Sequence, residues 1–174
     1  GNPMNHHDYY SAAQRPVETC VVGTGGFGRS FLAQGLRVPL MRARIAIDVD
    51  CSIAAAGFTA LGVSVDDIVR CATPDEARSA WAEGKFIVAA DLAVVTDLPF
   101  DVVVEATGNP EAGARNSLIA IEAGHHLVLV SKEVDSVIGP YLAHLAGQGG
   151  KVVTPVDGDQ PSLLIGLITW AQTL

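Results

Sequence analysis

The chain has 174 residues, 49% of them hydrophobic, and a formal net charge of −8. This length suits a single domain with a sizeable core, and the apolar content favours a homo-oligomer or packing against a further domain. The acidic balance, without a Lys/Arg cluster, argues against a nucleic-acid binder, and no apolar run reaches the roughly 18 residues of a membrane span.

The first 15 residues are polar and aperiodic and predict a disordered arm, whose Gly-Asn-Pro start ahead of Met4 resembles a vector remnant. This arm lacks the charged start and apolar centre of a secretory signal. The scattered cysteines, without metal-ligand spacing, indicate reduced core residues: Cys20, Cys51 and Cys71. We therefore expect residues 16–174 to form one cytoplasmic domain.

From Pro16 onward, short β-rich runs alternate with segments of helical periodicity. The expected strands are residues 17–22, 44–49, 86–89, 101–106, 126–130 and 151–154, and the expected helices are residues 27–36, 52–61, 74–84, 110–124, 139–148 and 161–174. This alternation predicts an α/β fold, a Rossmann-type doubly wound parallel sheet covered on both faces. No strand pattern follows residue 160, so we expect the chain to be truncated before a substrate or C-terminal domain, with further strands of the sheet missing.

A glycine-rich turn follows the first expected strand, in the stretch CVVGTGGFGRSF at residues 20–31. Its GxGxxG spacing between a strand and a helix predicts a dinucleotide-binding turn. The first glycine permits a tight bend, the second lets a pyrophosphate approach the backbone, and the third lets the helix pack closely on the strand. The residues expected to contact the cofactor here are Gly23, Thr24, Gly25, Gly26, Phe27 and Gly28.

An acidic residue stands at the end of the second expected strand. Asp48 lies 20 positions after Gly28, where a carboxylate of this fold accepts hydrogen bonds from the adenosine ribose hydroxyls. A carboxylate there repels a 2′-phosphate, so NAD is favoured over NADP. Asp50 is the competing candidate, with capping of the next helix as its other role. Arg29 could neutralise a 2′-phosphate, which leaves NADP open.

Polar residues also follow the later strands, at the edge where doubly wound sheets bind ligands. After residues 101–106, Thr107, Gly108 and Asn109, together with Ala106, could line the nicotinamide ribose. Asn109 before a proline also suits a helix cap, and both roles are compatible. None of the five histidines forms a plausible catalytic dyad, and His125 and His126 begin a strand at the opposite edge.

The last two strand ends carry the candidate chemistry. After residues 126–130, Ser131 is assigned to the cofactor, Glu133 to the substrate and Lys132 to catalysis, by binding an anion or polarising a carbonyl; an exposed surface lysine is the alternative. After residues 151–154, the stretch VDGDQP is either a helix cap or a substrate site. Its carboxylates suit Mg²⁺ or Mn²⁺, so a divalent cation is open although no metal-ligand set is predicted. The residues singled out are Asp159 as catalytic, and Asp157 and Gln160 as substrate-binding.

Five segments together resemble a known family: VVGTGGFGRSFLAQ, IAIDVD, DVVVEATGNPEAGARNSLIAIEAGHHLVLV, KEVD and DGDQPSLL. They are similar to the N-terminal half of homoserine-dehydrogenase-like oxidoreductases with a C-terminal SAF domain, over nearly all of residues 16–174. The resemblance implies an NAD(P)-binding domain, hydride transfer and, in reductoisomerase-like and oxidoisomerase-like members, a divalent cation and a coupled isomerisation. The chain departs from close relatives at residues 131 and 132, where Ser-Lys replaces Asn-Val.

The sequence therefore predicts the dinucleotide-binding domain of an NAD(P)-dependent oxidoreductase. Its substrate would be a small hydroxy or keto compound, such as a sugar acid or sugar phosphate. The alternative is a nucleotide-sensing module without catalysis, which needs the glycines and Asp48 but no polar cluster at residues 156–161.

Overall fold

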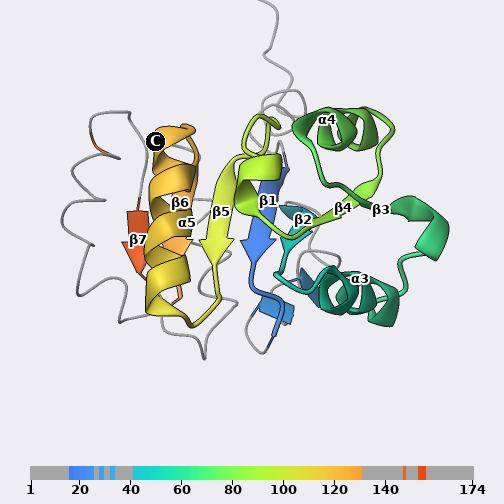
Figure 1. The fold of residues 1–174 in the computed structure, drawn as a ribbon, viewed down its shortest axis with the longest axis horizontal. Helices are drawn as coiled ribbons and strands as arrows, with labels where there is room; N and C mark the ends of the chain where they lie inside the picture. Colours follow the sequence, from blue (N-terminus) through green and yellow to red (C-terminus); the bar gives the residue numbers. More distant parts are fainter. Residues whose placement is uncertain are drawn as a thin grey trace, which may run out of the picture.

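A seven-stranded parallel sheet organises the chain (Figure 1). The computed structural model describes residues 16–25, 28–29, 32–33, 41–130, 147 and 153–155. The sheet order is β3-β4-β2-β1-β5-β6-β7. The strands are β1 (Val17–Val22), β2 (Met41–Ile47), β3 (Ile68–Arg70), β4 (Phe86–Ala89), β5 (Val102–Glu105), β6 (His126–Leu129) and β7 (Val153–Pro155).

The strand order is that of a doubly wound dinucleotide-binding domain with one strand added. With β3 set aside, β4-β2-β1-β5-β6-β7 reproduces the order of that fold. The chain runs outward from β1 to one side of the sheet and then returns to β5 on the other side of β1. This reversal is the topological switch point at which ligands of open α/β sheets bind.

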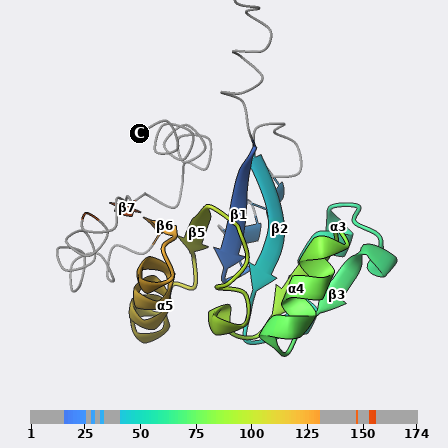
Figure 2. The same cartoon turned by 90° about the horizontal axis from the view of Figure 1, so that it is seen from above.

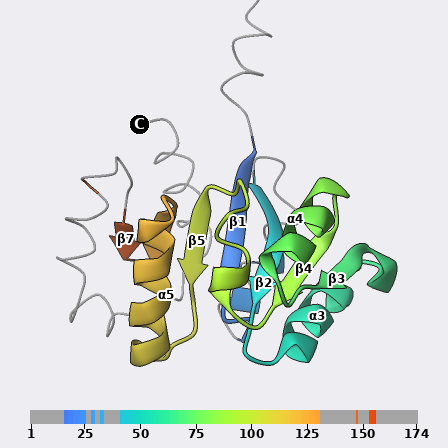
Figure 3. The same cartoon turned by 45° about the horizontal axis from the view of Figure 1, so that its top comes forward.

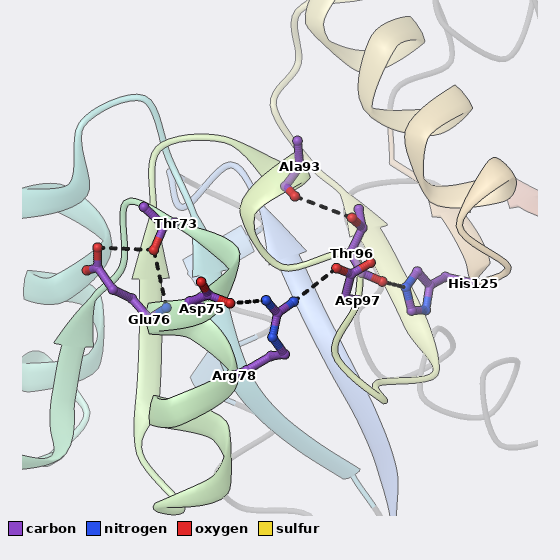
Figure 4. Close-up of polar contacts among 8 residues, drawn as sticks. All are labelled: Thr73, Asp75, Glu76, Arg78, Ala93, Thr96, Asp97 and His125. Atoms are coloured by element: carbon purple, nitrogen blue, oxygen red, sulfur yellow. Dashed lines mark hydrogen bonds and ion pairs between the residues drawn. The ribbon is translucent and has the colours of Figure 1, made fainter.

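Capped helices connect the strands. The α-helices are α3 (Cys51–Ala60), α4 (Pro74–Ala82) and α5 (Pro110–Glu122), and two 3₁₀ helices are η1 (Val65–Asp67) and η2 (Leu92–Val94). At the start of α4, Thr73 Oγ1 accepts from Glu76 N–H and donates to Glu76 Oε1, both at 3.2 Å (Figure 4). The bond from Glu76 N–H to Thr73 is one half of the capping box that the Thr-Pro-Asp-Glu stretch favours.

The core lies on both faces of the sheet, as the continuously apolar strands predict. Alternate strand residues such as Cys20 and Val103 face one cluster, which contains α4, η2 and α5 residues. Their neighbours, such as Val21 and Val104, face a second cluster with α3 and Leu32. Figure 2 shows α4 and α5 on the same side of β1 and β2, and Figure 3 shows α5 beside β5. Helix α5 also contacts β6.

The structure corrects two expectations about the sheet. The second strand is Met41–Ile47 rather than residues 44–49, because Met41 pairs with Val17 and extends the strand across two arginines. A further edge strand, β3, was not predicted, and it pairs with β4. The expectation that further strands of the sheet are missing stays a prediction.

Other expectations agree with the structure or fall outside it. All three cysteines are buried and free. No helix within the described ranges combines the length and hydropathy that crossing a bilayer requires. The arm at residues 1–15 and the expected helix at residues 161–174 lie outside the described residues, as does most of the expected helix at residues 139–148, of which only Gly147 is described, as helical.

Candidate functional site: a cavity at the topological switch point

A cavity of about 580 Å³ opens where β1, β2, β4 and β5 end. The carboxyl ends of these parallel strands meet at one edge of the sheet, and the segments that follow them form the walls. Part of helix α5 adds a further wall. The lining residues are 22–25, 47–49, 90–92, 106, 107, 109, 112, 115 and 116.

Two glycines of the turn are required by the packing of the chain itself. Gly23 has φ +88°, and a Cβ there would lie 2.7 Å from the backbone of Ala106 and of Thr107. A Cβ on Gly28 would lie 1.8 Å from Gly23 O. Only glycine allows both contacts, so the turn bends tightly and the following helix begins close against β1, as predicted.

Gly25 differs from these two glycines. A Cβ there would meet no atom within 4 Å, yet Gly25 is exposed and lines the cavity. Protein packing therefore does not require this glycine. The open space above it is the place where the sequence predicts a pyrophosphate. The neighbouring Gly26 and Phe27 lie outside the described residues.

Asp48 follows β2 and is fixed by three hydrogen bonds. Its Oδ2 accepts from Thr24 N–H at 3.2 Å and from Thr24 Oγ1 at 2.7 Å, and its Oδ1 accepts from Asp50 N–H at 3.0 Å. The carboxylate is thus held at the cavity wall beside the glycine turn. Asp50 instead caps α3 by accepting from Ser52 N–H at 3.0 Å, and it does not line the cavity.

Glu105, the last residue of β5, is a fully buried carboxylate behind the cavity wall. Its Oε1 accepts from the Thr107 N–H at 2.9 Å and from the Thr107 hydroxyl, and its Oε2 accepts from Asn116 Nδ2 at 2.9 Å. Burial raises the pKa of Glu105, while these donors act in the opposite direction. Both donor residues, Thr107 and Asn116, line the cavity.

An ion pair borders the cavity on the β4 side. Arg115 Nη2 of α5 lies 2.9 Å from Asp91 Oδ2, which follows β4 and caps η2. Burial of Asp91 favours the neutral acid, but its pKa is lowered because the Ala93 N–H and the Arg115 guanidinium outweigh that effect. Among the described lining residues, the charged groups are therefore two carboxylates and one guanidinium.

The structure brings together most of the predicted cofactor residues that it describes. The cavity lining includes Gly23, Thr24, Gly25, Asp48, Ala106, Thr107 and Asn109, whereas Gly28 and Gly108 lie beside it. Asn109 also caps α5 by accepting from Ala112 N–H at 3.0 Å. Arg29 is exposed at the start of the helix after the turn. The remaining predicted site residues lie outside the described residues: Ser131, Lys132, Glu133, Asp157, Asp159 and Gln160.

Sequence reasoning missed the wall formed by α5 and by the segment after β4. Asp91 lies two residues after a predicted strand, so the strand-end rule could have found it. Ala112, Arg115 and Asn116 have the spacing of one helix face, but that spacing alone does not say what the face covers. Burial of Glu105 had no signal in the sequence, because it depends on the packing of α5 against the sheet.

The described part of the cavity can bind a ligand, and its side chains do not suggest a metal centre or a nucleophile. Among the described residues no group of three metal-ligating side chains is found. Cys20 is fully buried, and burial, with Glu105 nearby, raises the pKa of its thiol, so it stays protonated. The glycine turn, the carboxylate of Asp48 and the cavity size fit the diphosphate and ribose of a dinucleotide.

Solved structures with a similar fold include dehydrogenases and a protein crystallised with NAD. GenD2 from gentamicin A biosynthesis, solved in complex with NAD, matches 81% of this chain with a TM-score of 0.61 and 19% identity. Scyllo-inositol dehydrogenase from Lactobacillus casei matches 82% with a TM-score of 0.58 and 14% identity. A homoserine dehydrogenase from Thiobacillus denitrificans matches 80% with a TM-score of 0.52 and 20% identity.

These likenesses establish the fold, an α/β domain like the NAD-binding domains of dehydrogenases. The chain spans only about a third of these proteins, 34% of GenD2, 36% of the inositol dehydrogenase and 29% of the homoserine dehydrogenase. No family model matches the sequence, and no curated protein matches it either.

Proposed function

We propose that the chain is the dinucleotide-binding domain of an NAD(P)-dependent oxidoreductase and that it prefers NAD. The observation that carries the proposal is the cavity at the switch point, where Gly25 leaves open space between a helix start and a fixed carboxylate. A bound nicotinamide dinucleotide supplies hydride-transfer chemistry that no side chain can supply. The structural neighbours include a protein solved with NAD, which supports this assignment.

In this proposal, different groups of the chain bind different parts of the dinucleotide along the cavity. Backbone N–H groups of the glycine turn and the following helix bind the diphosphate. Asp48 accepts hydrogen bonds from the adenosine ribose hydroxyls, and Thr24 keeps its carboxylate oriented. A 2′-phosphate would bring negative charge against Asp48, and Arg29 or another basic group would have to offset it.

The catalytic half of the proposal rests on the sequence and the family resemblance. Lys132 and Asp159 would hold the substrate carbon against the nicotinamide and stabilise alkoxide charge, with Glu133, Asp157 and Gln160 as further substrate contacts. We propose a small hydroxy or keto compound as the substrate class. In its more specific form, the proposal adds an isomerisation coupled to the hydride transfer and a divalent cation. A further domain or a second copy of the chain, favoured by the apolar composition, would pack against this one.

Calorimetric titration with NAD, NADH, NADP and NADPH tests the cofactor assignment. We expect NAD to bind, and Asp48→Asn to lower its affinity by about tenfold, because a charge-assisted hydrogen bond to the ribose is lost. The affinity for NADP should fall less than the affinity for NAD, so the variant should prefer NAD over NADP by a smaller factor than the starting protein does. Asp50→Asn is the matched control, since asparagine also caps helices and this residue lies outside the cavity lining. Binding of none of the four nucleotides would disprove the proposal.

A further inference from the structure

Glu105 has a demanding set of hydrogen-bond partners. It is 0% exposed, and within the described part of the chain the groups that contact its carboxylate oxygens are all donors: two on Thr107 and one on Asn116. An ionised carboxylate only accepts hydrogen bonds, and a buried one requires such donors. A neighbouring side chain that has both a donor and an acceptor must therefore turn its donor toward this carboxylate.

The consequence is sharpest for Asn116, whose amide has a donating and an accepting end. Because Glu105 offers only oxygen atoms, Nδ2 of Asn116 faces Glu105 at 2.9 Å. The Oδ1 atom of Asn116 can then accept a hydrogen bond from a group other than Glu105. Asn116 lines the cavity, on the same face of α5 as Ala112 and Arg115. This wall of the cavity therefore presents a hydrogen-bond acceptor.

A dinucleotide bound as proposed above would place its adenosine half in this cavity. The ribose would lie at Asp48, and the cavity continues from there to Ala112 and Asn116. Within adenosine, the ribose hydroxyls are used by Asp48, so the exocyclic amine of adenine is the remaining donor. Ala112 offers an apolar contact to a flat base along the same wall.

We propose that Glu105 is a positioning residue that orients Asn116 so that Asn116 Oδ1 accepts a hydrogen bond from the exocyclic amine of adenine. This inference rests on the proposed function and adds specificity for the base. A site that uses a buried acceptor to bind an amine discriminates against an analogue that carries an oxygen there. Nicotinamide hypoxanthine dinucleotide is that analogue of NAD, with a carbonyl oxygen in place of the amine.

The variant Glu105→Gln should reverse this selectivity. The Thr107 N–H is a backbone donor that cannot turn around, so it keeps the glutamine oxygen beside it. The glutamine amide would then face Asn116 and force its side chain to rotate, which presents Nδ2 to the base. A donor at that point favours the hypoxanthine oxygen over the adenine amine.

Titration of the chain with both dinucleotides tests this inference. We expect the starting protein to bind NAD about tenfold more tightly than the hypoxanthine analogue. The ratio should fall below one in Glu105→Gln and to about one in Asn116→Ala, which has no amide. Glu122→Gln, an exposed residue at the end of α5, is the charge-matched control and should keep the original ratio.

Several outcomes overturn the inference. Equal affinity of the starting protein for the two dinucleotides would do so while leaving the proposed function intact, because both still bind. An unchanged ratio in folded Glu105→Gln would also overturn it. Should that variant not fold, retention of the ratio in Asn116→Ala would overturn it instead. Binding of neither dinucleotide disproves the proposed function, and this inference with it.

Discussion

The two ends of the parallel strands carry similar polar side chains but are built differently. At the amino ends, Asp101 accepts from Glu18 N–H at 2.9 Å, and His125 stacks on Phe100 with ring centroids 3.9 Å apart. Both ring nitrogens of His125 lie 2.9 Å from carbonyl oxygens, those of Phe100 and Thr96 (Figure 4 shows the latter contact). The rings of Phe100 and His125 pack together at this end, and the side chains of Asp101 and His125 bond to the backbone of neighbouring segments.

At the carboxyl ends, Asp48 and Glu105 are likewise held by N–H and hydroxyl donors, but Asp48 lines a cavity of about 580 Å³ and Glu105 lies behind its wall. The two ends of the sheet differ in the residues that surround these polar groups. Glycines replace the side chains that would fill the space, and the polar groups remain beside an open volume. A polar cluster thus becomes a candidate ligand site only where the chain also leaves room for the ligand.

The largest expected effects come from two glycine variants at the carboxyl ends of the strands, one of which should affect stability and the other NAD binding. Gly28→Ala should lower the free energy of unfolding by about 4 kcal/mol, because its Cβ would overlap backbone that cannot move away cheaply. Gly25→Ala should change it by less than about 1 kcal/mol yet weaken NAD binding by about tenfold, since the methyl group enters the cavity. Urea unfolding and calorimetry measure the two quantities. Equal destabilisation by both variants would contradict the distinction between them.

A substitution at the amino end should affect stability without affecting binding. His125→Ala removes a buried ring and leaves two carbonyl oxygens without its nitrogens, so we expect a loss of about 2–3 kcal/mol in the free energy of unfolding. The affinity of the folded variant for NAD should stay within about twofold of the starting value. A large loss of affinity at constant stability would show that the two ends are coupled.

The smallest expected effect concerns pH. Burial raises the pKa of Glu105 above its ordinary value of 4.5. The unfolded chain then releases this proton first, so the stability contributed by Glu105 is full below pH 4.5 and is lost as pH rises through the higher folded value.

Relative to Glu105→Gln, the starting protein should lose stability as the pH rises across this window. Urea titrations of both proteins from about pH 4 to about pH 8 measure the difference. A difference that stays constant with pH would mean that Glu105 titrates at the same pH in the folded and unfolded chains.

The predictable part of the molecule is the part whose signals are local. The glycine spacing, the acidic residue after the second strand and the Asn-Pro helix start each depend on residues close together in the chain. The structure accordingly places Gly25, Asp48 and Asn109 around one cavity. Strand β3 was missed because three half-buried or exposed residues carry little local pattern, and pairing with β4 stabilises them.

By itself the sequence determined the class of fold and the turn that opens the site, because hydrophobic periodicity and glycine spacing act over a few residues. Only the tertiary structure decided that Glu105 is buried, that Asn116 faces it, and that Asp91 pairs with Arg115 across the cavity rim. These contacts join residues from separate elements, and their energies depend on burial and distance, which are set when the helices pack on the sheet.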